Sequence, residues 1–156
     1  MQCIKEAVKL LEKQKIFLEY KKNNPESFLL NAFATFDDKE LIWQLNYYNP
    51  IKKNLVIFTP LKKEKSEEQK LFKESKNLQE LNLKEIKIEI KEALNLIKTS
   101  SEKTIKKIIT IHTIKNKTIW NFIFLTSSFK TLNIKLNASS GKIISKKLIP
   151  MFAKKS

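Results

Sequence analysis

Apolar residues recur along the chain with two different periods, and these periods predict where helices and strands form. Residues 4–20 carry apolar side chains at helical spacing, with Lys and Glu between them. This is the pattern of an amphipathic helix with one buried face. Residues 28–36, 41–49 and 54–59 instead alternate apolar and polar positions, as strands with one buried face do. Pro25 separates the two kinds of pattern, because proline disfavours helical backbone in the residue before it.

The second half of the chain shows the same succession of patterns. Residues 82–97 carry an apolar stripe at helical spacing, which predicts a second amphipathic helix. Residues 105–114, 118–126 and 129–137 alternate apolar and polar side chains and are separated by short polar turns. Each half therefore predicts one helix followed by three antiparallel strands.

Several residues of the two halves correspond at a fixed spacing. The two Trp residues, Trp43 and Trp120, lie 77 positions apart within the most apolar strand of each half. The helices share the motif Ile-Lys-Glu-Ala, which begins at Ile4 and again at Ile90. Such self-similarity predicts a repeated structural unit. It also predicts that both Trp side chains are buried between sheet and helix.

The predicted fold class is α+β, with two tandem repeats that each pack one α-helix on a three-stranded antiparallel β-sheet. The boundaries that follow are a first unit over residues 1–60, a charged linker over 61–81, a second unit over 82–150 and a basic tail over 151–156. Within the linker, the run from Ser66 to Gln69 has the spacing of a capping box and allows a short helix. A solvated connection is the preferred interpretation there.

The second unit resembles a PepSY domain. The residues that carry the resemblance are Ile90-Lys91-Glu92-Ala93-Leu94, Ile119-Trp120-Asn121-Phe122 and Asn137-Ala138-Ser139-Ser140-Gly141-Lys142-Ile143-Ile144. In the last motif Asn137 replaces the usual Asp and Ser140 the usual Thr, and Gly141 stands where a positive φ is expected. The first unit keeps the helix and the Trp but lacks this closing motif. The resemblance implies a PepSY/cystatin-like fold and a non-enzymatic, extracytoplasmic module that binds or restrains partner proteins, often peptidases.

The charge of the chain is concentrated near its end. The formal net charge is +15, and all 31 basic residues are Lys. Residues 103–156 hold twelve of them and no Asp or Glu. This asymmetry indicates an acidic partner or an anionic surface. A Lys-rich proteome would also produce the excess, and the absence of Arg weakens the case for reading nucleic-acid bases.

The residue types that usually carry catalysis or hold metals are isolated in this sequence. His112 is the only His, and Cys3 has no His in its half of the chain. A Cys so near the start could be the lipid-bearing residue of a lipoprotein, but no lipobox precedes it, so a free thiol is preferred. One Gly cannot form a Gly-rich phosphate loop. We therefore expect no enzymatic activity, no cofactor and no metal.

The expected function is that of a cell-envelope interaction module, which binds a protein partner through a sheet face or edge. The alternative is binding of nucleic acid or an anionic surface through the Lys-rich C-terminal third. No apolar run approaches the roughly 20 residues of a membrane span. The expected location is extracytoplasmic or periplasmic, with the cytoplasm as the alternative. The residues expected to contact a partner are Tyr48, Phe129, Lys130, Lys142, Lys146 and Lys147.

Overall fold

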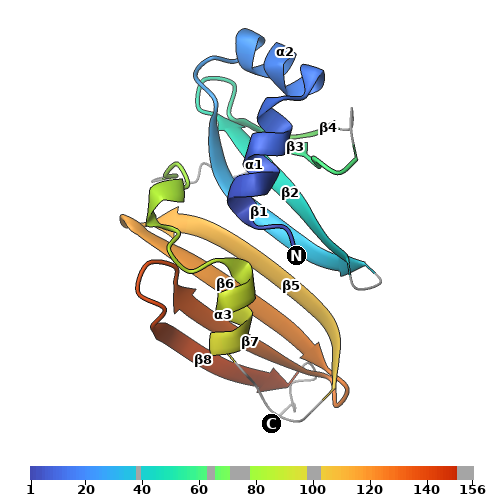
Figure 1. Ribbon diagram of the computed structural model, residues 1–156, viewed down its shortest axis with the longest axis vertical. Helices are drawn as coiled ribbons and strands as arrows, with labels where there is room; N and C mark the ends of the chain where they lie inside the picture. Colours follow the sequence, from blue (N-terminus) through green and yellow to red (C-terminus); the bar gives the residue numbers. More distant parts are fainter. Residues whose placement is uncertain (38–39, 63–65, 71–77, 98–102, 151–156) are drawn as a thin grey trace.

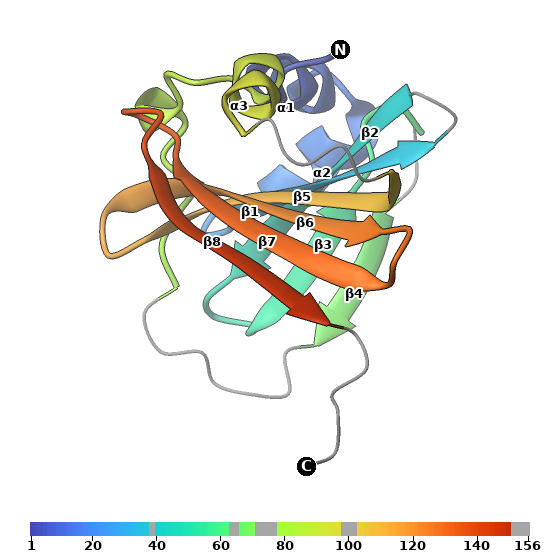
Figure 2. The same ribbon diagram turned by 90° about the horizontal axis from the view of Figure 1, so that it is seen from below.

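One antiparallel sheet of eight strands dominates the protein. The computed structural model describes residues 1–37, 40–62, 66–70, 78–97 and 103–150. Helices α1 (Ile4–Glu12) and α3 (Ile90–Leu96) lie on the same face of the sheet, as Figures 1 and 2 show. This face buries the hydrophobic core, and the other face carries no helix among the described residues.

The sheet is built from two meanders that meet in its middle. The strand order is β4-β3-β2-β1-β5-β6-β7-β8, and every neighbouring pair is antiparallel. Chain neighbours are therefore sheet neighbours everywhere except at the β1–β5 pair, which joins the two meanders. The strands are β1 (Phe28–Asp37), β2 (Glu40–Asn49), β3 (Asn54–Phe58), β4 (Ser66–Lys70), β5 (Thr104–Ile114), β6 (Lys117–Thr126), β7 (Lys130–Asn137) and β8 (Ile143–Pro150).

The prediction of an α+β protein made of two tandem repeats, each with its own three-stranded sheet, is therefore wrong. The strands form a single sheet, to which each half of the chain contributes four strands. The physical reason lies at β1 and β5. In two separate sheets each of these would be an edge strand with unpaired backbone N–H and C=O groups. Pairing them satisfies those groups and gives the helices of both halves one common core.

The β1–β5 pair brings small side chains together under the helices. Ala32 pairs with Ile111 and Ala34 with Ile109, and all four are fully buried. Phe33 and Thr110 form the pair between them. The two alanines leave space above β1 for the large side chains of the neighbouring strands.

Trp43 and Trp120 fill that space, and the prediction that both are buried in equivalent places is confirmed. Trp43 is 1% exposed and Trp120 is fully buried. Their ring centroids are 6.1 Å apart. The indole Nε1 of Trp43 donates to the carbonyl of Gln2 at 2.9 Å, and that of Trp120 donates to the carbonyl of Ile88 at 2.7 Å. Each Trp thus fixes the segment that leads into the helix above it.

The first predicted helix is divided in two. Helix α1 ends at Glu12, and α2 (Lys15–Asn23) begins after Gln14, whose backbone is extended. The periodicity predicted that Leu18 lies on the buried stripe of this helix. In the structure Phe17 is buried instead, and Leu18 is 55% exposed. The side chain of Gln14 donates to the carbonyl of Pro60 at 2.7 Å, a tertiary contact at the break.

The second predicted helix, over residues 82–97, is also shorter than expected. A 3₁₀ turn, η1 (Leu83–Glu85), precedes α3, and the chain between them is not helical. There the backbone N–H groups of Lys87 and Ile88 both donate to the carbonyl of Ala138. Hydrogen bonding to the end of β7 thus replaces the helical hydrogen bonds that the periodicity predicted.

Two strands lie where none was predicted. Ser66–Lys70, within the expected linker, forms β4 on the outer side of β3, so the capping-box helix considered for this run is wrong. Ile143–Pro150 forms β8 on the outer side of β7. The sheet therefore extends one strand further at each end than the sequence indicated.

The closing turn between β7 and β8 is held by the residues predicted for it. The Asn137 side chain accepts hydrogen bonds from the backbone N–H of Ser139 at 2.8 Å and of Ser140 at 3.0 Å. Gly141 has a φ of +78°, so the predicted positive φ is confirmed. A Cβ built on Gly141 would lie 3.3 Å from the Leu96 side chain.

We expect Trp43→Ala and Trp120→Ala each to lower the free energy of unfolding by about 3–5 kcal/mol, because each leaves a large cavity in the shared core. Trp→Phe at the same positions should cost less, since one aromatic ring remains and the loss is limited to the N–H donor and part of the indole volume. Urea denaturation of the four variants measures these differences. A loss below about 1 kcal/mol at either position would contradict the structure.

Replacing Gly141 by Val should destabilise the protein by about 1–2 kcal/mol, because a β-branched residue is strained at positive φ. Gly141→Asn is the matched control. It adds the same Cβ beside Leu96, but Asn tolerates the left-handed region. Equal losses in the two variants would show that crowding rather than backbone conformation decides the cost. Thermal unfolding compares them directly.

Candidate interaction surface at the edge strand β8

Strand β8 is an exposed edge of the sheet with large apolar side chains. It pairs with β7 on one side, and in the described part of the chain no strand pairs with its other side. Its apolar side chains are about half exposed, namely Ile143 at 49%, Ile144 at 50%, Leu148 at 56% and Ile149 at 50%. Exposed apolar edge strands present unpaired backbone groups to which another strand can add. This edge therefore has the features of a strand-addition site.

The same edge is positively charged on both faces. Lys146 pairs with Ile134 and lies on the helix side, together with Leu148. Lys147 pairs with Asn133 and lies on the opposite side, together with Ile149. Each face of β8 thus offers one ammonium group and one large apolar side chain. No Asp or Glu follows Glu102 in the sequence to offset this charge.

The opposite edge of the sheet has the other sign of charge. Strand β4 carries Glu67 and Glu68, and the Glu68 carboxylate accepts a hydrogen bond from the Asn54 side chain at 2.7 Å. Short, charged edge strands of this kind discourage the addition of another strand. The two edges therefore differ, and β8 is the more accessible to an apolar partner.

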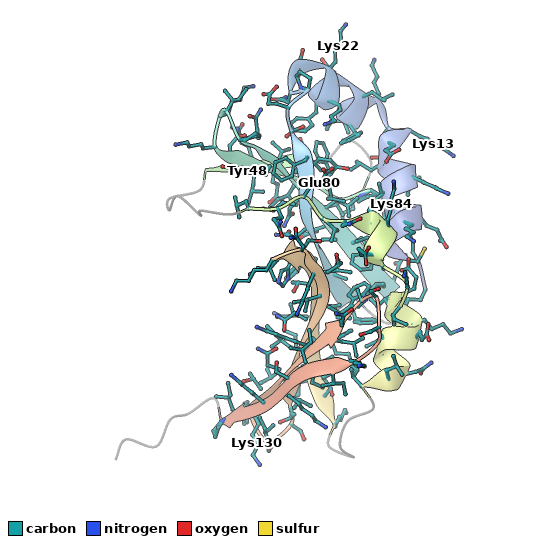
Figure 3. The ribbon with its side chains drawn as sticks, turned by 90° about the vertical axis from the view of Figure 1, so that its left-hand side faces the viewer. Lys13, Lys22, Tyr48, Glu80, Lys84 and Lys130 are labelled. Atoms are coloured by element: carbon teal, nitrogen blue, oxygen red, sulfur yellow. The ribbon has the colours of Figure 1, made fainter. Side chains whose placement is uncertain are left out.

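The face without helices carries a row of amide side chains. The Asn46 side chain donates to Asn31 across the β1–β2 pair at 2.6 Å. On β6 and β7 the side-chain oxygens of Asn121 and Asn133 are buried and have no hydrogen-bond partner among the described residues. Tyr48 also lies on this face, edge-on to Phe28 with ring centroids 5.7 Å apart. Figure 3 shows Tyr48 on the side of the sheet opposite the helices.

The structure groups five of the six predicted contact residues around β7 and β8. Lys146 and Lys147 lie on β8, Lys142 lies in the turn before it, and Lys130 begins β7 opposite Pro150. Phe129 is 53% exposed in the turn that leads to Lys130. Tyr48 is separate from them, half-buried on β2 in the other half of the sheet. The predicted basic tail, residues 151–156, lies outside the described residues.

The last predicted strand ends at residue 137, so Lys146 and Lys147 were expected beyond the sheet, and that placement is wrong. A signal for β8 exists in the sequence, because β-branched and apolar residues flank its two lysines on both sides. The lysine pair interrupts the alternation that identifies the other strands. As a result the exposed apolar side chains of this edge were missed.

His112 and Cys3 lie apart from any cluster of metal-binding side chains in the described structure. Within the described residues, no group of three or more His, Cys, Asp or Glu side chains is arranged to hold a metal ion. Burial raises the pKa of the Cys3 thiol, which is the opposite of what a reactive cysteine requires. Burial, with a smaller effect from the Lys135 ammonium, lowers the pKa of His112. His112 lies on β5 between Asn31 and Ile119, as a half-buried strand residue.

Comparison with known proteins finds a solved structure with a similar fold. No family model matches the chain, and no curated protein sequence matches it. The crystal structure of a candidate lipoprotein from Clostridium difficile 630 has a similar fold, with a TM-score of 0.62. The two chains are 12% identical, and the similarity covers 94% of this chain and 92% of the other. At this identity the likeness shows the fold alone.

The described helices are short. None of them has both the length and the apolar composition needed to cross a membrane.

We expect His112 to make the protein less stable as the pH falls. The pKa of His112 is lower in the folded protein than its ordinary value of 6.5. As the pH falls, the imidazole is therefore protonated more readily in the unfolded chain than in the folded protein, which favours unfolding. Stability should therefore fall as the pH drops below about 6.5. Urea denaturation at about pH 7.5 and 5.5 should show a smaller loss on acidification for His112→Gln than for the wild type. Equal losses would contradict this assignment.

Proposed function

We propose that the protein is a non-enzymatic binding module of the cell envelope, which takes an extended segment of a partner protein as an added strand along β8. The observation that carries the proposal is the unpaired edge of β8 with its four half-exposed apolar side chains. In strand addition the backbone hydrogen bonds supply affinity, and the alternating side chains supply specificity. Both kinds of group are available at this edge.

The chemistry of β8 defines the segment that would fit. A strand placed beside β8 meets Lys146 and Leu148 on one face and Lys147 and Ile149 on the other. A complementary segment carries an acidic and an apolar residue on each of its own faces. Such complementarity sets register and the rate of association more than affinity.

Two likenesses support a location in the cell envelope. One is the resemblance of residues 82–146 to PepSY domains, which are usually extracytoplasmic. The other is the similar fold of the candidate lipoprotein from Clostridium difficile 630. Both agree with a module that acts outside the cytoplasm.

Binding of a nucleic acid or an anionic surface is the second candidate. It is favoured by one observation, the absence of acidic residues over 103–156 beside twelve Lys. Lys side chains can neutralise phosphates without reading sequence, and such binding weakens steeply as salt rises. The apolar side chains of β8 would have no role in this function.

Designed peptides test the leading proposal. A ten-residue peptide of Val and Thr that carries one Glu and at least one Val on each of its two faces should bind at about 0.15 M salt and slow hydrogen exchange along β8. The same peptide with Lys in place of Glu should bind at least about tenfold more weakly, because its charges oppose Lys146 and Lys147. Leu148→Gln combined with Ile149→Gln should weaken binding of the Glu peptide. The matched control is Ile114→Gln, which changes an exposed apolar residue on β5.

The outcomes separate the two functions. Exchange protection that appears on β4 instead of β8, or equal binding of both peptides, would overturn strand addition at β8. Tight binding of duplex DNA or anionic vesicles at about 0.15 M salt, lost in a Lys146→Gln/Lys147→Gln variant, would favour the second candidate.

A further inference from the structure

A cavity of about 410 Å³ lies on the helix side of the sheet, far from β8. It is bounded by α1, α2, the beginning of β1 and the segment that leads into η1. Its size falls within the range of small-molecule binding sites. The lining residues are Val8, Glu12, Phe17, Leu18, Lys21, Phe28, Leu29, Tyr47, Glu80, Leu81 and Leu83.

Buried aromatic rings form one side of the cavity, and an exposed leucine lies on another. Phe17 and Tyr47 are each 5% exposed, and their ring centroids are 4.9 Å apart. Phe28 also borders the cavity from β1, while its ring packs against Tyr48 on the other face of the sheet. Leu18, which the sequence placed on the buried stripe of the helix, is more than half exposed and also lines this cavity.

Two carboxylates give the cavity a negative charge in a strongly basic protein. Glu12 comes from α1, and Glu80 comes from the segment before η1. Among the described lining residues Lys21 is the one cation, and its ammonium group donates a hydrogen bond to the carbonyl of Ser27, which holds it in place without neutralising its charge. The described lining thus carries two carboxylates and one ammonium group.

The charges of both carboxylates affect the Tyr47 hydroxyl at the buried end of the cavity. Burial raises the pKa of the Tyr47 hydroxyl well above its ordinary value, and the charges of Glu12 and Glu80 add to the rise. The phenol is therefore neutral at physiological pH. Its oxygen can accept a hydrogen bond from a ligand.

We propose that this cavity binds a small organic ammonium ion with an apolar body. The apolar body packs against Phe17, Tyr47 and Leu18, and the ammonium group lies against the two rings as cation–π contacts require. Its N–H groups donate to the carboxylates of Glu12 and Glu80 and to the Tyr47 hydroxyl. An anion of the same size would meet two carboxylates against the one ammonium group of Lys21 and should bind more weakly.

A groove beside the cavity shares Val8, Glu12 and Leu83 with it and is otherwise lined by Lys5, Lys9 and Lys84. More distant charges of this strongly basic chain matter less, because exposed charges beyond about 8 Å are screened at physiological salt. The charged groups of the cavity and of this adjoining groove therefore decide which ligand binds.

Alkylammonium groups have two sources, a free amine and the lysine side chain of a peptide. Phenethylammonium represents the first source and Nα-acetyl-lysine-N-methylamide the second. The neutral 2-phenylethanol and the anionic 3-phenylpropionate have nearly the same shape as phenethylammonium. These four compounds separate the effect of charge from that of the apolar body.

An NMR titration of the ¹⁵N-labelled protein at about 0.15 M salt tests the proposal. Phenethylammonium should shift the amide signals of Phe17, Leu29, Tyr47 and Leu81, and its dissociation constant should be about tenfold lower than that of 2-phenylethanol. The lysine derivative binding more tightly than phenethylammonium would assign the site to a peptide side chain. The reverse order would assign it to a free amine. Equal or tighter binding of the alcohol or the anion, or no saturable binding up to about 10 mM, would overturn the proposal.

Matched variants test the role of each group. Glu12→Gln combined with Glu80→Gln removes the charge at two exposed positions without changing shape, so the fold is retained. It should abolish the preference for phenethylammonium over the alcohol and leave the affinity for the alcohol unchanged. Tyr47→Phe should weaken ammonium binding alone. Glu19→Gln, an exposed residue of α2 outside the lining, is the control, and an equal loss there would contradict a local site.

Discussion

The contact between Trp43 and Trp120 is the interaction on which the rest of the structure depends. It joins β2 of one meander to β6 of the other, above a β1–β5 pair that would otherwise be held by backbone hydrogen bonds and a few small side chains. Burial of two indoles removes a large apolar surface from water. Their N–H donors also fix the segments before α1 and α3, through Gln2 and Ile88. Sheet, helices and core are thus positioned around one pair of side chains.

The pairing of β1 with β5 at the centre of the sheet determines which strands form its two edges. Because β1 and β5 pair with each other, the unpaired backbone groups of the molecule are moved to β4 and β8. One of these edges is short and carries two glutamates, and the other is apolar and carries two lysines. The proposed partner site is therefore a consequence of the same pairing that produces the single core.

The sequence predicted local structure well where a single period runs through a whole element. The strands around Trp43 and Trp120 and the left-handed Gly141 follow from patterns of a few residues. Pairing of β1 with β5 was not predictable in this way, because its register depends on residues about 77 positions apart. The helix breaks at Gln14 and Lys87 depend on hydrogen bonds to Pro60 and Ala138, which no local pattern records. The cavity was missed for the same reason, since its walls come from five separate segments.

The single long-range pairing at β1–β5 also has a kinetic consequence. All other strand pairs join neighbours in the chain, which close short loops and pay little entropy. The two meanders can therefore form early and independently, while the ladder between residues 31–35 and 108–112 closes the longest loop. Topologies dominated by local contacts fold quickly, and each distant pairing slows the search. Folding of this chain should be limited by the encounter of two partly formed meanders, and the joining of the tryptophans should mark the end of that step.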